Sequence, residues 1–143
     1  MPYDGPTGSM VPARARIESV VSGSRSGVLC EYAIDLGFSR LTVKGEWIGG
    51  DLLITVSGGE LPHIGTVVMA CPRPSLTGDG TMSATSSVMN VVGHKDEEIC
   101  RYLAQSAAAR HSAVTVCLGG FHVDAMTAEQ ITDLMRAVRS LTI

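Results

Sequence analysis

The sequence has few aromatic residues, little charge and no closely spaced cysteine pair. Aromatic residues make up 4% and charged residues 17% of the 143 residues, against 45% hydrophobic residues, and the net charge is −3. Without a Lys/Arg run, the chain has no electrostatic footprint for nucleic acid. No apolar run approaches the ~20 residues of a transmembrane helix, and no signal peptide pattern is present. The composition predicts a globular, cytoplasmic protein with neither a nucleic acid nor a membrane as partner.

The four cysteines are scattered through the sequence, and none forms a CxxC pair. They are Cys30, Cys71, Cys100 and Cys117. This spacing argues against a zinc ribbon or a thioredoxin-like motif. Free thiols in apolar surroundings are therefore expected.

Residues 1–10 (MPYDGPTGSM) are rich in Gly, Pro and Ser and have no periodicity. We interpret them as an expression-tag remnant or a disordered leader. Residues 11–143 are expected to form a single domain.

The first half of the remaining chain has the alternation of apolar and polar residues that is typical of strands. The expected strands span 15–22, 28–36, 40–48, 52–56 and 66–71. Short turns between them predict an antiparallel meander. Pro72 and Pro74 then argue against a central strand, and 88–92 could be a strand or a short helix.

The second half has the 3.6-residue apolar spacing of helices on either side of a β-branched run. A helix is expected from about 93 to 111, a buried strand over 113–118, and a closing helix after Thr127. Thr127 and Gln130 have the spacing of a capping box. The fold class is therefore predicted to be α+β, with an antiparallel meander sheet and two helices packed on one face.

Three histidines stand where a loop is expected to meet a helix or strand. They are His63, His94 and His122, and Glu60 and Asp124 lie close to two of them. Imidazole and carboxylate are common ligands of zinc, iron and manganese, so the three histidines are a candidate metal site. Their spacing matches no known metal signature, and exposed loop histidines explain the pattern as simply.

Arg73 is a candidate anion-binding residue, because it stands between two prolines that stiffen its backbone. A guanidinium group can bind two phosphate oxygens at once. Several hydroxyl side chains follow that could donate to the same anion: Ser75, Thr85, Ser86 and Ser87. Neither GxxxxGK[ST] nor GxGxxG is present, and a solvent-exposed loop arginine is the alternative.

Four segments together resemble a known family. They are GGDLLITVSGGELPHIGTVV, CPRPSL, TSSVMNVVGHKDE and GGFHVDAMTAEQI. In this order they are similar to the small prenylated-flavin chaperones, the D-type proteins encoded beside UbiD-like decarboxylases of the gallate-decarboxylase kind. The resemblance extends from about Gly49 to the end of the chain.

The resemblance implies an accessory protein that binds prenylated FMN and helps its delivery to, or maturation in, a UbiD-like (de)carboxylase. A flavin prenyltransferase is a second candidate partner. His63, His94 and His122 would line the cofactor or a divalent metal beside it. The phosphate would be bound by the hydroxyl and guanidinium groups named above, with His63 completing the cofactor-binding set.

Two other functions stay open from the sequence alone. The chain could be a metal-dependent enzyme that uses the three histidines, or a structural subunit of a decarboxylase complex. A homo-oligomer is also expected, because a meander leaves sheet edges that need covering.

Overall fold

The computed structural model describes residues 25–91 and 96–143, so the leader, the expected strand at 15–22 and His94 lie outside the described residues. The elements follow in the order β1 (Gly27–Asp35), β2 (Arg40–Ile48), β3 (Asp51–Gly59), β4 (Thr66–Pro74), β5 (Met82–Asn90), α1 (Glu97–His111), β6 (Thr115–His122) and α2 (Ala128–Ser140).

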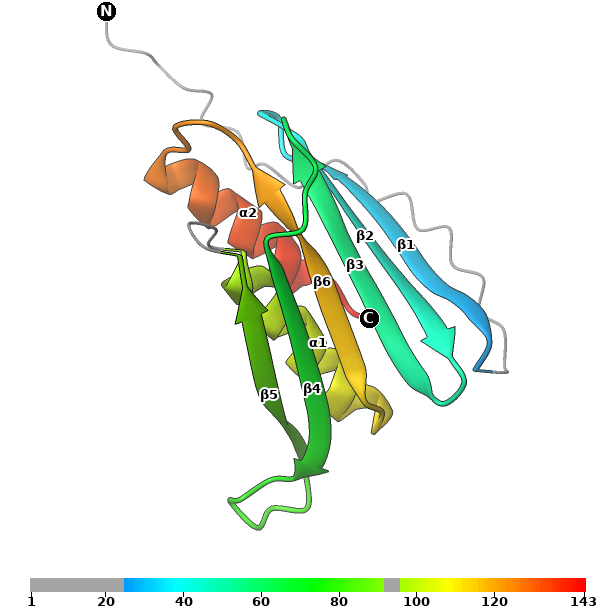
Figure 1. Ribbon diagram of the computed structural model, residues 1–143. Coiled ribbons are helices and arrows are strands. Elements are labelled where there is room, and N and C mark those ends of the chain that lie inside the picture. The colour runs from blue at the N-terminus through cyan, green and yellow to red at the C-terminus, as the bar shows by residue number, and fades with distance from the viewer. Residues whose placement is uncertain (1–24, 92–95) are drawn as a thin grey trace, which may run out of the picture.

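The strands form one six-stranded sheet in the order β1-β2-β3-β6-β4-β5. Only the β3–β6 pair is parallel, and the other neighbours are antiparallel. Both helices lie on the same side of the sheet (Figure 1). The predicted α+β class, with a mainly antiparallel sheet and two helices, is therefore confirmed. Within the described residues, neither helix is long and apolar enough to cross a membrane.

The path of the sheet differs from a simple meander after β3. Strands β1 to β3 do form one, but β6 lies between β3 and β4. The stretch 57–65 therefore passes over the end of β6 instead of closing a hairpin. Its backbone pairs with β6 on the way: Glu60 N donates to His122 O at 2.7 Å, and Gly65 N donates to Gly119 O at 2.9 Å. A buried β-branched strand such as β6 needs neighbours on both edges, which the central position provides.

Strand β4 continues through the two prolines that were expected to end it. Strand β6 pairs only with Thr66–Ala70 of β4, whereas β5 pairs with β4 as far as Pro74. Beyond Ala70 one side of β4 is thus an edge, where a residue without an N–H breaks no ladder. The expected end of this strand at residue 71 was therefore wrong, whereas the argument against a central strand at the two prolines agrees with the structure.

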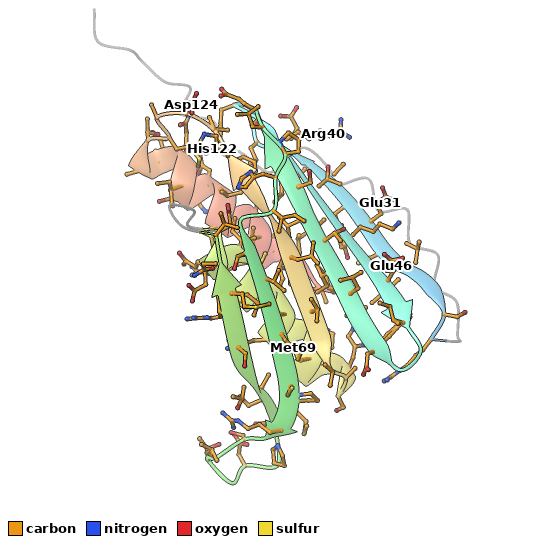
Figure 2. All side chains as sticks on the ribbon, in the orientation of Figure 1. Glu31, Arg40, Glu46, Met69, His122 and Asp124 are labelled. Atoms are coloured by element: carbon orange, nitrogen blue, oxygen red, sulfur yellow. The ribbon has the colours of Figure 1, made fainter. Side chains whose placement is uncertain are left out.

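The core lies between the sheet and the helices. Alternate residues of the central strands are buried on that side, among them Leu41, Val43, Ile54, Val68 and Cys117. Helix α1 packs against β4, β5 and β6. The end of the chain covers β1, where Tyr32 Oη donates to Thr142 O at 2.9 Å. The face turned away from the helices carries Met69, which is 47% exposed (Figure 2).

The predicted capping box of α2 is confirmed. Thr127 Oγ1 accepts from Gln130 N at 3.1 Å, and Gln130 Oε1 accepts from Thr127 N at 3.0 Å. Residues 88–92, left open between strand and helix, belong to β5 as far as Asn90. Strand β6 extends through Gly119 and Gly120, which were expected to be loop.

Replacing the cap, Thr127→Ala, is expected to lower the free energy of unfolding by about 1 kcal/mol, because Gln130 N loses its acceptor. Urea denaturation followed by circular dichroism measures the change. Thr132→Ala is the control, since Thr132 is an exposed residue within the same helix. Equal effects of the two substitutions would contradict a specific role for the cap.

Candidate functional site

The candidate site lies at the edge of the sheet where the parallel strands β3 and β6 both end. His63 is on the connection that follows β3, and His122 is the last residue of β6. Their ring centroids are 6.1 Å apart and the rings are nearly perpendicular. Figure 2 shows His122 and Asp124 at this end of the sheet. The topology thus brings together two of the three histidines singled out from the sequence.

His63 has a hydrogen-bond acceptor at each ring nitrogen. Its Nδ1 lies 2.9 Å from the carbonyl oxygen of Leu61, and its Nε2 lies 3.0 Å from Asp96 Oδ2. A neutral imidazole carries only one N–H, so both bonds are made when the ring is a cation and Asp96 is ionised. The Leu61 carbonyl raises the pKa of His63; partial burial opposes this, and the Asp96 carboxylate adds to the rise.

Asp96 also binds the backbone of the sheet, in addition to its contact with His63. It is 5% exposed, and its Oδ1 accepts from Phe121 N at 2.9 Å. It stands at the N-cap of α1, yet its side chain makes no capping hydrogen bond to that helix. Asp96 is missing from the residues that the sequence predicts for the site. In the sequence it is one of several acids at a helix start, and its partners lie 25 and 33 residues away.

Two glycines, Gly65 and Gly120, leave room for the His63 and Asp96 side chains. A Cβ atom on Gly120 would lie 2.6 Å from His63 Nε2 and 2.8 Å from Asp96 Oδ2. A Cβ on Gly65 would overlap the Asp96 carboxylate. Glycine is therefore required at both positions, because the His63 and Asp96 side chains approach the backbone too closely for a Cβ atom.

His122 forms a second, more exposed histidine–carboxylate pair. Its Nε2 lies 2.8 Å from Asp124 Oδ1, and the two side chains are 42% and 81% exposed. Asp124 N donates to Glu60 Oε2 at 3.5 Å. Glu60, His122 and Asp124 are therefore neighbours.

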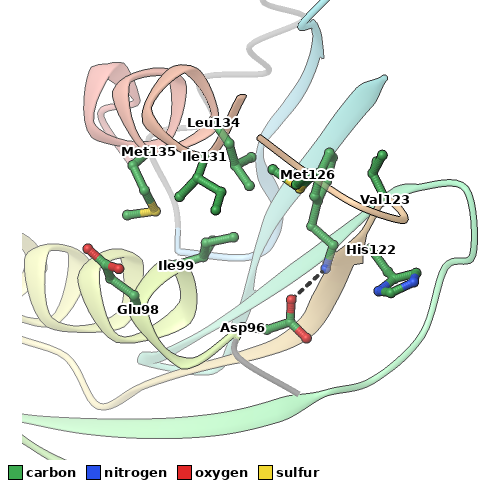
Figure 3. A pocket seen from close by; sticks show the side chains of 10 residues that line it. Asp96, Glu98, Ile99, His122, Val123, Met126, Ile131, Leu134 and Met135 are labelled. Atoms are coloured by element: carbon green, nitrogen blue, oxygen red, sulfur yellow. Dashed lines mark hydrogen bonds between the residues drawn. The ribbon is translucent and has the colours of Figure 1, made fainter. Parts of the chain in front are cut away.

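A cleft of about 400 Å³ opens beside these residues. Its walls come from the start of α1, the end of β6 with the loop that follows, and α2 (Figure 3). The lining is mostly apolar, with Ile99, Phe121, Met126, Leu134 and Met135. Asp96, Glu98 and His122 are its polar groups. His63 does not line the cleft, but it contacts Asp96, which does.

Of the predicted phosphate-binding residues, Arg73 and Ser75 lie at the opposite end of the sheet, and Thr85, Ser86 and Ser87 lie along the middle of β5. Arg73 Nε donates to Thr85 Oγ1 at 2.8 Å, across the hairpin that β4 and β5 form. Ser75 directly follows β4. Ser86 points the other way and accepts from Gln105 of α1 at 2.8 Å, while Ser87 is exposed on the face that Thr85 shares.

Arg73 follows Thr66 by seven residues of extended strand, which is about 23 Å at 3.3 Å per residue. The predicted cofactor-binding set is therefore divided between two places on the sheet, with Arg73 far from His63.

A metal site is not supported by the described part of the chain. In residues 25–91 and 96–143, no three His, Cys, Asp or Glu side chains gather in a way that could hold a metal ion. His94, the third predicted ligand, lies outside these residues.

Replacing Asp96 with Asn is expected to lower the pKa of His63, because one of the two acceptors facing the ring loses its charge. The shift should be partial, since the Leu61 carbonyl remains. Proton NMR titration of the imidazole measures it, and Asp124→Asn, beside His122, is the matched control. An unchanged His63 titration in Asp96→Asn would contradict the ion pair.

The same pair predicts how stability depends on pH. The pKa of His63 is higher in the folded chain, so its stabilising contribution is full below the unfolded-state value of about 6.5 and is lost as the pH rises through the folded-state value. Unfolding by urea at several pH values should show this loss in the wild type and not in His63→Gln. Parallel pH profiles would argue against it.

Comparison with known proteins shows to which family the chain belongs. A search of curated proteins gives no match. A comparison with family models matches residues 37–143 to the prenylated flavin chaperone LpdD-like domain. This match covers the whole sheet from β2 onward, both helices and every described residue of the site. The chain belongs to the prenylated flavin chaperone LpdD-like family.

Proposed function

We propose that this protein binds prenylated FMN in the cleft between β6, α1 and α2 and passes it to a UbiD-like (de)carboxylase in the cytoplasm. The observation that carries the proposal is the cleft itself: an apolar hollow of about 400 Å³ beside two histidine–carboxylate pairs, in a chain of the prenylated flavin chaperone family.

The size and lining of the cleft suit a flavin ring system. Small-molecule sites are commonly about 300–1,000 Å³, mostly apolar, with a few polar groups that fix orientation. The ring of a prenylated flavin is broad and largely apolar, and it carries polar atoms along one edge. Met126 and Met135 offer adaptable side chains for the added prenyl-derived ring. Asp96 and His122 supply polar contacts at one end.

The position of the cleft also suits a carrier. Ile131, on its α2 wall, is 49% exposed, so the cleft opens to solvent. A ligand that enters from the surface can leave by the same path to a partner enzyme. The recipient enzyme, a contribution from a flavin prenyltransferase and assembly into a homo-oligomer stay predictions.

Filling the cleft is expected to abolish binding of the flavin. Ile131→Trp adds bulk to the wall from a half-exposed position, so the fold should tolerate it. Anaerobic native mass spectrometry with prenylated FMN, and with FMN for comparison, measures the bound fraction. The wild type should bind one prenylated flavin per chain, and Ile131→Trp should bind none.

Ile48→Trp is the matched control, because Ile48 is 62% exposed at the end of β2 and does not line the cleft. It should bind as the wild type does, and both variants should keep the wild-type melting temperature. Binding that survives in Ile131→Trp would move the site elsewhere, and a wild type that binds no flavin would contradict the function.

Transfer to a partner is tested separately. Mixing the flavin-loaded protein with an apo UbiD-like decarboxylase should move the flavin mass from the small chain to the large one in native mass spectra. Flavin that stays on the small chain while the decarboxylase remains empty would argue against delivery.

A further inference from the structure

The flavin cleft lies beside a second hollow that contains arginine side chains. This groove, of about 670 Å³, runs between α1 and α2. It shares Glu98, Ile131 and Met135 with the cleft, so the two hollows lie side by side along α2. Figure 3 shows Glu98 and Met135 on facing helices at the junction. Beyond the junction the lining becomes polar.

Two guanidinium groups border the far part of the groove. Arg136 and Arg139 are three residues apart on α2, which places them on one side of the helix. Arg139 follows Ile131 by eight residues, or about 12 Å at 1.5 Å per residue. The ribityl chain with its phosphate, together with the length of the Arg139 side chain, can bridge this distance from a ring in the cleft.

The present partners of these arginines are weak competitors for a phosphate. Arg139 Nη2 lies 3.3 Å from Glu98 Oε1, and Arg136 Nη1 lies 3.1 Å from Asp133 Oδ1. The Arg139 and Glu98 side chains are 59% and 65% exposed, and an exposed ion pair of this kind contributes little. A phosphate with nearly two charges can replace a single carboxylate as the partner of Arg139.

We propose that Arg136 and Arg139 form the anchor for the 5′-phosphate of the bound flavin. The inference rests on the proposed function and adds the residues that recognise the ligand's phosphate. Thr132 and Ser140 also line the groove, but their hydroxyls already donate to helix carbonyl oxygens. The two arginines therefore carry the recognition.

The junction residue Glu98 gives the proposal a distinctive consequence. Its carboxylate lines both the cleft and the groove and lies 3.3 Å from Arg139 Nη2. A phosphate bound to Arg139 must take the place of this carboxylate and is repelled by its charge. Removing the charge should therefore strengthen the binding of a phosphorylated flavin more than that of an unphosphorylated flavin.

The test compares two ligands, prenylated FMN and the prenylated riboflavin obtained from it with a phosphatase, in anaerobic titrations. The variants are Arg136→Gln/Arg139→Gln, Glu98→Gln and the matched control Arg73→Gln. The double variant should bind prenylated FMN about 10- to 100-fold more weakly, as expected for lost hydrogen bonds between charged groups, with unchanged affinity for prenylated riboflavin. Glu98→Gln should bind prenylated FMN more tightly, and Arg73→Gln should match the wild type.

Wild-type affinity in the double variant would overturn the anchor, and so would an equal loss for both ligands. Loss of prenylated FMN binding in Arg73→Gln would overturn it in favour of the hairpin at the other end of the sheet. In each of these cases the wild type still binds the flavin and the proposed function stands. A wild type that binds neither ligand would overturn both.

Discussion

The buried carboxylate of Asp96 is the contact on which the arrangement of the site depends. One of its oxygens accepts from the backbone N–H of Phe121 in β6, and the other lies 3.0 Å from Nε2 of His63. A carboxylate that is 5% exposed is costly to bury unless it is paired and hydrogen-bonded. The two contacts of this carboxylate join the start of α1, the end of β6 and the β3–β4 connection.

This contact positions the walls of the cleft. Asp96 leads directly into α1, which contributes Ile99 and Glu98, and Phe121 leads into the loop and α2. The capping box at Thr127 then sets where α2 begins, and with it the position of Arg136 and Arg139 along the groove. The proposed binding site thus depends on one ion pair, two glycines and one helix cap.

Local features of the sequence predict local features of the structure well. Strand β2 has the predicted bounds, because the alternation of apolar and polar residues and the two turns beside it can be recognised from a short stretch of sequence. The cap of α2 likewise needs only Thr127 and Gln130. The insertion of β6 between β3 and β4 is not encoded locally, so the meander could be predicted only as far as β3. His63 and His122 stand out because glycine-rich segments surround them. Asp96 does not, since its partners are distant, and Arg136 and Arg139 resemble any exposed helix residues.

The most direct test of the central claim is NMR of the protein with ¹³C-labelled methionine methyl groups, recorded anaerobically with and without prenylated FMN. Met126 and Met135 line the cleft, whereas Met82 and Met89 lie on β5 and Met69 on the open face of the sheet. If the cleft holds the flavin, the signals of Met126 and Met135 should shift strongly and the other three should hardly change. Shifts confined to Met69 and Met89 would place the flavin on the other face of the sheet and contradict the account.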